Sequence, residues 1–176
     1  MNRTKMKSFL LSLKDSELSQ VFNRLLADNP DLVKKAYDIA VAITDDVDED
    51  SIMDEVYYAL DALDVDELYA RSGRTRHGYV EPHDEAWAMF EEAITPFLDE
   101  IVKCHNRNQP NAAKVHCIGI IKGLRKFDED SISDFKDWVV DAPSDYVSSV
   151  VDAWKKGNPS ENDISDVMLF AECNSF

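Results

Sequence analysis

A short segment with three arginines and a histidine is the part of this 176-residue sequence best suited to chemistry. It includes Arg71, Arg74, Arg76, His77 and Tyr79, with one glycine before the second arginine and another after the histidine. A guanidinium group presents a fork of N–H donors that matches carboxylate and phosphate oxygens. Backbone N–H groups at the glycines could join such a site. These five residues are therefore candidate binding residues for an anion or an acidic peptide.

The surrounding sequence also permits a purely structural role for these arginines. Residues 36–70 contain no lysine or arginine but twelve acidic residues, so the arginines could pair with neighbouring acidic helices and hold a crossover loop in place. In that case at least two of them should bond to nearby carboxylates, such as those of Asp61, Asp64, Glu67 or Glu91. We expect a mixed outcome, in which the first arginine holds the end of its helix and the other two stay available.

Other motifs of catalysis or metal binding are incomplete. Asp46, Asp48 and Asp50 resemble the first ligands of an EF-hand, but Ser51 and Tyr57 stand where that loop needs glycine and glutamate, which leaves at most a weak cation site. The sequence lacks a P-loop, a zinc-protease motif, a nucleophile elbow and the Glu-x-x-His pairs of di-iron bundles. We therefore predict no catalytic residue and no cofactor.

Cys104-His105 and His116-Cys117 mirror each other about a turn expected near Pro110. Sulfur and nitrogen ligands suit zinc, and an antiparallel hairpin would bring the two pairs near each other. Adjacent helical residues point about 100° apart, however, and buried cysteine is a common core residue. Ordinary packing is the favoured interpretation of these four residues, with zinc as the alternative.

An enzyme remains the rival to a binding module. In that hypothesis His77 or His83 carries a proton, with Glu91 or Glu92 beside it. A deep apolar pocket at the arginine-rich segment would favour a small-anion-binding protein or enzyme that uses residues 71–77. A groove without a pocket would favour a module that binds another protein.

Composition limits the class of protein. The chain has a formal net charge of −16, and 44% of its residues are hydrophobic, so we expect one folded domain over residues 1–176. The negative charge argues against nucleic-acid and membrane partners. Three cysteines are too few for a disulfide framework, and neither a signal peptide nor a membrane span is evident. These features predict a cytoplasmic location.

Helix signals dominate the sequence and predict an all-α fold. A capping residue at 15 or 16 and Asn29-Pro30 bound one helix, and Pro82 starts a long helix that Pro96 should kink or break. Strand signals are weak, so the segment from residue 72 to 81 is expected to be a loop. Further helices are expected at residues 30–43, 51–63, 64–71, 110–125, 131–141, 144–156 and 161–172.

Apolar residues at helical spacing predict the core. Trp87, Phe90, Val150 and Trp154 each lie three or four residues from other apolar side chains, which is typical of a buried stripe. The segment from Gly119 to Gly123 has the spacing of a membrane dimer motif in a polar context. It therefore predicts a close approach of two helices inside the fold.

One pentapeptide occurs twice, as residues 48–52 and 128–132, and a proline precedes each copy at the same offset of 80 residues. This similarity predicts that residues 30–62 and 110–142 form equivalent helical hairpins. Stacked antiparallel hairpins would give a short α-solenoid of the HEAT-like kind. An irregular helical bundle is the alternative.

The arginine-rich segment also carries a resemblance. Residues 68–82, followed by Ala86-Trp87 and Glu91-Glu92, resemble a stretch of uncharacterised prokaryotic proteins, some of which have an N-terminal SWIM-type zinc finger. The resemblance implies a helical domain, and the cysteine and histidine pattern of the finger is missing here. The sequence as a whole favours a non-enzymatic protein-interaction module with an acidic helical surface, an arginine-rich loop and an unidentified protein partner.

Overall fold

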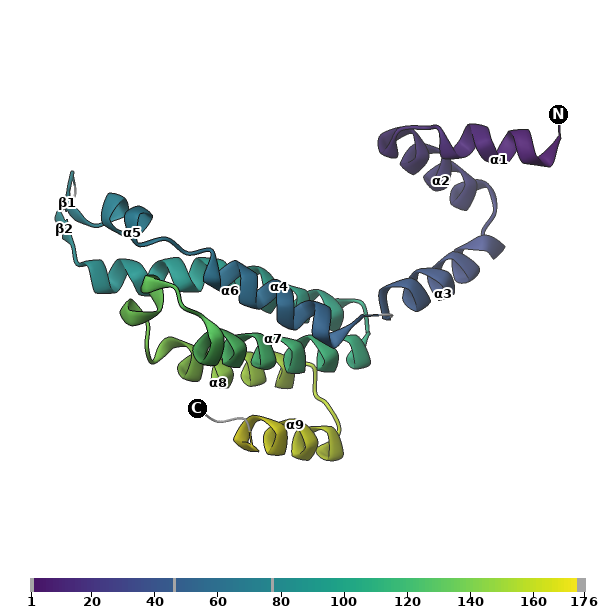
Figure 1. Cartoon of the computed structure of the whole chain (residues 1–176). Coiled ribbons are helices and arrows are strands. Elements are labelled where there is room, and N and C mark those ends of the chain that lie inside the picture. The colour runs from purple at the N-terminus through teal and green to yellow at the C-terminus, as the bar shows by residue number, and fades with distance from the viewer. Residues whose placement is uncertain (1, 46, 77, 174–176) are drawn as a thin grey trace. The chain divides into compact units, whose positions relative to one another are not determined.

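The computed structural model describes residues 2–45, 47–76 and 78–173 (Figure 1). Within these residues the chain is almost entirely helical, and its only strands form one short antiparallel pair. The predicted all-α class is confirmed. The chain divides into two compact units, residues 1–44 (unit 1) and residues 45–176 (unit 2). The expectation of one domain over residues 1–176 does not anticipate this division.

Unit 1 contains the three helices α1 (Arg3–Leu11), α2 (Asp15–Asp28) and most of α3 (Asp31–Asp45). The turn at Asn29-Pro30 separates α2 from α3, as the sequence predicts. No described residue of unit 1 is buried, so the apolar stripes of these helices do not form the core that such stripes usually form.

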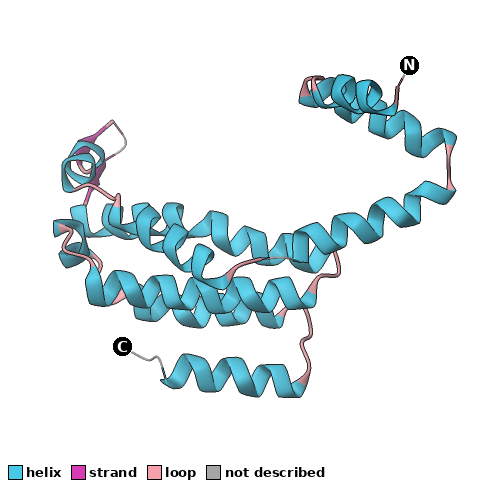
Figure 2. Ribbon diagram, turned by 45° about the vertical axis from the view of Figure 1, so that its right-hand side comes forward, coloured by secondary structure: helices cyan, strands magenta, loops and turns pink. Residues whose placement is uncertain are grey.

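Unit 2 holds the buried core, which lies among its helices and includes no residue of unit 1. Figure 2 shows its helices in cyan, with the two strands in magenta at one end. Its helices are α4 (Glu49–Asp61), α5 (Val65–Arg71), α6 (Pro82–Asn106), α7 (Pro110–Asp130), the 3₁₀ helix η1 (Asp134–Trp138), α8 (Ala142–Lys155) and α9 (Glu161–Cys173).

The predicted core residues are mostly confirmed. Phe90, Val150 and Trp154 are buried in unit 2, and Phe90 packs against Phe127 of α7 with ring centroids 6.1 Å apart. Trp87 is only partly buried at the edge of this core. Its indole Nε1 is shielded from solvent and has no hydrogen-bond partner among the described residues.

Two glycines bring α7 close to α4, as the sequence predicts. A Cβ atom at Gly119 would lie 2.8 Å from the Cβ of Ile52, and one at Gly123 would lie 2.5 Å from the Cβ of Val56. Both distances are shorter than side chains tolerate in a packed core. The glycine spacing therefore serves helix packing inside unit 2.

The repeated pentapeptide does not form equivalent structures. In its first copy Asp48 caps the start of α4 and Ile52 is buried. In its second copy the acidic residues end α7, Ser131 follows in an extended conformation, and Ile132 is 98% exposed. The predicted equivalence of the two hairpins is therefore wrong, because acidic residues can flank either end of a helix. Unit 2 matches the alternative, an irregular helical bundle.

Helix α6 is continuous through Pro96, so of the two predicted outcomes, a kink or a break, the break does not occur. Ile94 and Ile101 are fully buried on either side of it. Their packing outweighs the roughly 3 kcal/mol that an internal proline costs a helix.

Among the described residues, no helix combines the length and the apolar character needed to cross a membrane.

Candidate functional site

The arginine-rich segment folds as a β-hairpin rather than as the loop expected over residues 72–81. Strand β1 (Gly73–Thr75) pairs antiparallel with β2 (Gly78–Val80), and Arg74 lies opposite Tyr79. Each strand begins with a glycine at positive φ, 91° and 138°, a conformation that other residues adopt rarely. Sequence reasoning missed the hairpin because its turn lacks the usual Asn-Gly or Asp-Gly pair.

Arg71 holds the end of α5 against α6, as expected of the first arginine. Its Nε and Nη2 donate to the carboxylate of Glu67 at 3.0 and 2.7 Å, and its Nη1 donates to Glu92 at 2.7 Å. Oε1 of Glu85 lies 3.8 Å from Nη1 of Arg71. The pKa of Arg71 is raised above its ordinary value by the hydrogen bond to Glu92 first and by that to Glu67 second. Glu67 was among the expected partners, whereas Glu92 takes the place expected of Glu91.

Arg74, Arg76 and Tyr79 differ from Arg71 because all three are exposed. Tyr79 is 65% exposed, and as the cross-strand partner of Arg74 it shares one face of the hairpin with it. Neither Arg74 nor Arg76 forms an ion pair with any residue in the part of the chain that the structure describes. His77, the fifth candidate, lies outside the described residues.

The exposed arginines lie apart from five well-defined cavities of the described residues. Neither Arg74 nor Arg76 lines any of these five cavities. A small cavity of about 230 Å³ lies beside Arg71, and Glu67 and Glu92, which bind that arginine, also line it. The positive charge at this cavity is therefore already matched by carboxylates.

Two of the residues proposed for proton transfer, His83 and Glu92, contact other side chains of unit 2, and His77 lies outside the described residues. His83 lies in the first turn of α6, and its ring makes an edge contact with Trp87 at a centroid distance of 6.2 Å. Glu92 is occupied by Arg71 at 2.7 Å. His83 and Glu92 therefore have structural contacts of their own.

The residues considered for zinc are also used in packing. Cys104 and Cys117 are both buried, and burial raises the pKa of the Cys117 thiol to about 12. His105 Nε2 lies 3.2 Å from the carbonyl oxygen of Ala153. Burial lowers the pKa of His116. No group of three or more metal-ligating side chains occurs within residues 2–45, 47–76 and 78–173.

The acidic run before α4 serves helix capping and ion pairing. Asp48 accepts hydrogen bonds from the backbone N–H of Ser51 at 3.1 Å and from its hydroxyl at 2.7 Å, and these bonds lower the pKa of Asp48. Asp50 accepts a hydrogen bond from Lys122 at 3.1 Å. Asp46, the first residue of the EF-hand pattern, lies outside the described residues.

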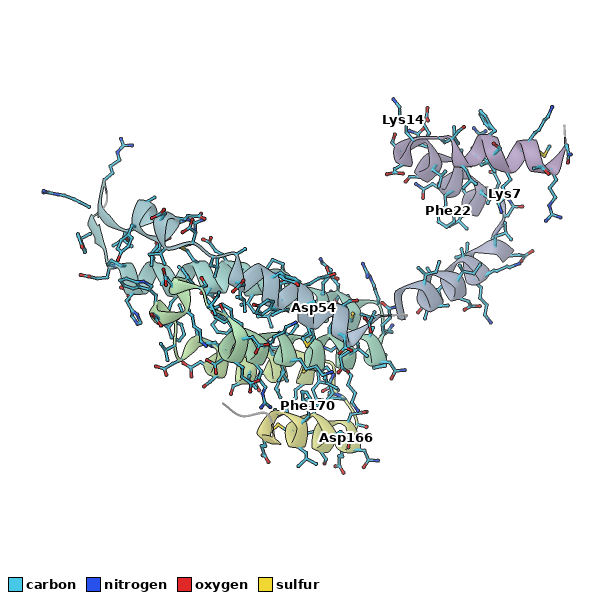
Figure 3. The ribbon with its side chains drawn as sticks, in the orientation of Figure 1. Lys7, Lys14, Phe22, Asp54, Asp166 and Phe170 are labelled. Atoms are coloured by element: carbon cyan, nitrogen blue, oxygen red, sulfur yellow. The ribbon has the colours of Figure 1, made fainter. Side chains whose placement is uncertain are left out.

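Several lysines of α7 are engaged with acidic side chains of other helices. Lys126 lies 2.7 Å from Asp54 of α4, and Lys114 lies 2.6 Å from Asp163 of α9 (Figure 3 labels Asp54). Sequence reasoning missed these pairs because their partners are about 50 to 70 residues apart in the chain. Unit 2 thus uses cations of α7 to join helices, whereas the cations of the hairpin are directed to solvent.

The comparisons with known proteins add no relative to this picture. Protein-family models, curated proteins and solved structures give no match. The hairpin is consequently interpreted from its own geometry, in which Arg74 and Tyr79 share one face and Arg76 lies at the turn.

Proposed function

We propose that this protein is a non-enzymatic interaction module that binds an acidic segment of a partner protein through its hairpin. The observation that carries the proposal is the exposure of Arg74 and Arg76 without ion pairs among the described residues, in a chain with a net charge of −16. Acidic side chains are abundant, yet these two guanidinium groups remain uncompensated. Uncompensated guanidinium groups are well suited to bidentate contacts with carboxylate or phosphate oxygens.

The hairpin supplies a second element of recognition. Tyr79 lies beside Arg74 across the strand pair, so an aromatic ring and a guanidinium group are offered together. Tyrosine and arginine are enriched in the energetically dominant positions of protein interfaces. Arg71 anchors the base of the hairpin through Glu67 and Glu92, which limits the conformational entropy lost on binding.

An acidic peptide fits this surface better than an enclosed small molecule. The alternative function, a small-anion-binding protein or enzyme using residues 71–77, needs a cavity at the exposed arginines. Neither exposed arginine lines the five cavities described above, and the arginine that does border one of them is neutralised by two glutamates. An open surface of this kind suits an extended partner segment.

The proposal is tested with a defined peptide and matched variants. A fluorescein-labelled peptide of ten glutamates is titrated with the wild-type protein, with Arg74→Ala, with Arg76→Ala and with the double variant, and binding is followed by anisotropy. A glutamine peptide of equal length reports binding that does not depend on charge. Arg107→Ala removes an exposed arginine elsewhere in unit 2 and serves as the control.

We expect each single variant to weaken binding several-fold and the double variant to weaken it by at least about tenfold, with Arg107→Ala unchanged. The affinity should fall as salt is raised, because screening acts on exposed charges. Equal binding by the wild type and the double variant would contradict the proposal, as would equal binding of the two peptides. In a lysate, the partners recovered by the wild type at low salt should likewise be lost with the double variant.

A further inference from the structure

The helices of unit 1 carry apolar faces that no part of unit 1 covers. Eight large apolar side chains of α2 and α3 are between 43% and 70% exposed, although they recur at helical spacing. They are Leu18, Val21, Phe22, Leu25, Val33, Tyr37, Ile39 and Ile43. Exposure of so many neighbouring apolar residues is typical of a surface that meets a partner.

These faces meet in a groove between α2 and α3. Figure 1 shows the two helices diverging from the turn that joins them, and Figure 3 labels Phe22 on the side of α2 that faces α3. The groove has a volume of about 440 Å³, and Lys35 is its one charged lining residue within the described part of unit 1. Leu25 and Ile39 line it from opposite helices.

Unit 1 is too small to be stable with these faces in water. It comprises 44 residues, and chains near or below about 40 residues usually need a disulfide, a metal or association with another chain to fold. Its helices are 9, 14 and 15 residues long, and isolated helices under about 12–15 residues are marginal in water. A second apolar surface would supply the core that unit 1 lacks.

The distribution of charge shows where two copies of this chain can meet. Unit 1 has seven basic and five acidic residues, a net charge of +2, whereas unit 2 has twelve basic and thirty acidic residues, a net charge of −18. Contact between two copies of unit 2 would place like charges together, which is unfavourable. Contact between two copies of unit 1 brings together only +2 and +2, so it is opposed by much less repulsion.

The available area also fits a dimer. Eight half-exposed side chains at roughly 100 Å² each present on the order of 800 Å² of surface, which is what one partner contributes to a stable interface of standard size. We infer that unit 1 is a dimerisation element, in which α2 and α3 of two copies pack through their apolar faces as a four-helix bundle. A closed two-fold pair is the commonest arrangement of identical chains.

The full-length protein tests this inference through its oligomeric state. Size-exclusion chromatography with light scattering is performed from about 1 to 200 µM, a range that brackets micromolar affinities. Leu25→Asp and Ile39→Asp place a charge on either side of the groove. Ile132→Asp and Leu169→Asp change residues of unit 2 that are 98% and 62% exposed, and they are the matched controls.

The wild type should have the mass of a dimer of the 20.0 kDa chain at the upper concentrations. The two groove variants should remain monomers throughout, and the two controls should dimerise like the wild type. A monomeric wild type at every concentration would overturn the inference. Dimerisation of the groove variants, or growth beyond a dimer, would overturn it as well.

Salt dependence separates the dimer from two other occupants of the groove. Pairing of apolar faces should be unchanged or stronger at about 0.5 M NaCl, because salt screens the repulsion between the two acidic units. A tenfold loss of affinity in salt would instead mean that unit 1 docks on the acidic unit of another copy. Flotation of a monomeric wild type with phosphatidylserine vesicles would identify a lipid surface as the occupant. Either result would contradict the dimer.

Discussion

Nη1 of Arg71, the last residue of α5, donates a hydrogen bond to Oε2 of Glu92 on α6 at 2.7 Å. This bond and the bond to Glu67 fix the base of the hairpin to the helical bundle. The neighbouring arginines of the hairpin lack such bonds among the described residues. Position along one short segment thus separates an arginine that stabilises the fold from two that are available for binding.

Loss of Arg71 should therefore lower stability, and loss of Arg74 should not. In urea unfolding, Arg71→Ala is expected to shift the midpoint to lower concentration without a change in the m-value. A double-mutant cycle with Glu92→Ala should give a favourable coupling between the two residues. Zero coupling, or an equal loss of stability in Arg74→Ala, would show that the bond between α5 and α6 does not stabilise the fold.

The contact of α4 with α7 predicts that replacing a glycine of α7 with alanine lowers stability, although alanine normally stabilises a helix relative to glycine. Gly123→Ala should destabilise the protein by about 1–3 kcal/mol through overpacking, although alanine favours a helix over glycine by about 1 kcal/mol. The new Cβ would lie 2.5 Å from that of Val56. In a Val56→Gly background, which removes that Cβ, the same substitution should cost less. A more stable Gly123→Ala variant in the wild-type background would rule out the close approach.

The half-buried ring of His116 predicts a pH dependence of stability. Burial lowers the pKa of His116 in the folded protein, while Glu100 and Glu55 act in the opposite direction. Between the folded pKa and the ordinary pKa of 6.5, the unfolded chain binds a proton at His116 that the folded chain does not. The free energy of unfolding therefore decreases as the pH is lowered through this range, and it is constant below the folded pKa.

His116→Gln should reduce that slope in urea unfolding between about pH 7.5 and 5. A variant at the exposed His83 controls for the loss of a histidine as such. Identical slopes in the wild type and His116→Gln would show that the ring is not protonated less readily in the folded state.

Lys114 should govern the attachment of α9. Its Nζ lies 2.6 Å from Asp163 and 3.3 Å from Asp166, both on α9, and Figure 3 labels the second of these acids. Lys114→Ala should speed hydrogen exchange in α9 while leaving α4 unchanged. Lys126→Ala, which removes a pair to α4 instead, is the matched control and should not affect α9. Equal exchange of α9 in both variants would contradict the role of Lys114.

The lowered pKa of Asp163 makes its contact with Lys114 sensitive to acid. The hydrogen bond from Lys114, and then that from Ser160, lowers the pKa of Asp163 below its ordinary value of 3.8. The stabilisation is therefore present above pH 3.8 and is lost as the pH falls through the folded pKa. Exchange in α9 should accelerate in that range in the wild type and vary less in Lys114→Ala.

Local signals in the sequence were sufficient for most of the fold. The prolines at the starts of α3, α6 and α7 act within one helical turn, so they can be read without knowledge of the partner helices. The glycine pair of α7 and the i, i+4 pair of Glu67 and Arg71 are likewise local patterns. Burial is different, because it depends on what lies opposite a helix face. The apolar stripes of α2 and α3 therefore resembled those of unit 2 although they are exposed.

The sequence predicted which residues gather at the candidate site better than it predicted their backbone structure. The arginine cluster was evident from the sequence, and so was the structural role of Arg71 at a helix end. The hairpin depends on two glycines at positive φ, which the sequence shows only as residue types. The choice of Glu92 over Glu91 depends on the rotation of α6 about its axis, which tertiary packing sets.

The buried thiol of Cys117 can report how often the helical bundle of unit 2 opens. Its thiol is inaccessible, and burial raises its pKa to about 12, so very little thiolate is present at neutral pH. Alkylating reagents attack the thiolate and must also reach it. Modification of Cys117 therefore proceeds only when α7 separates from its neighbours, and its rate measures how often the centre of the protein is exposed to water.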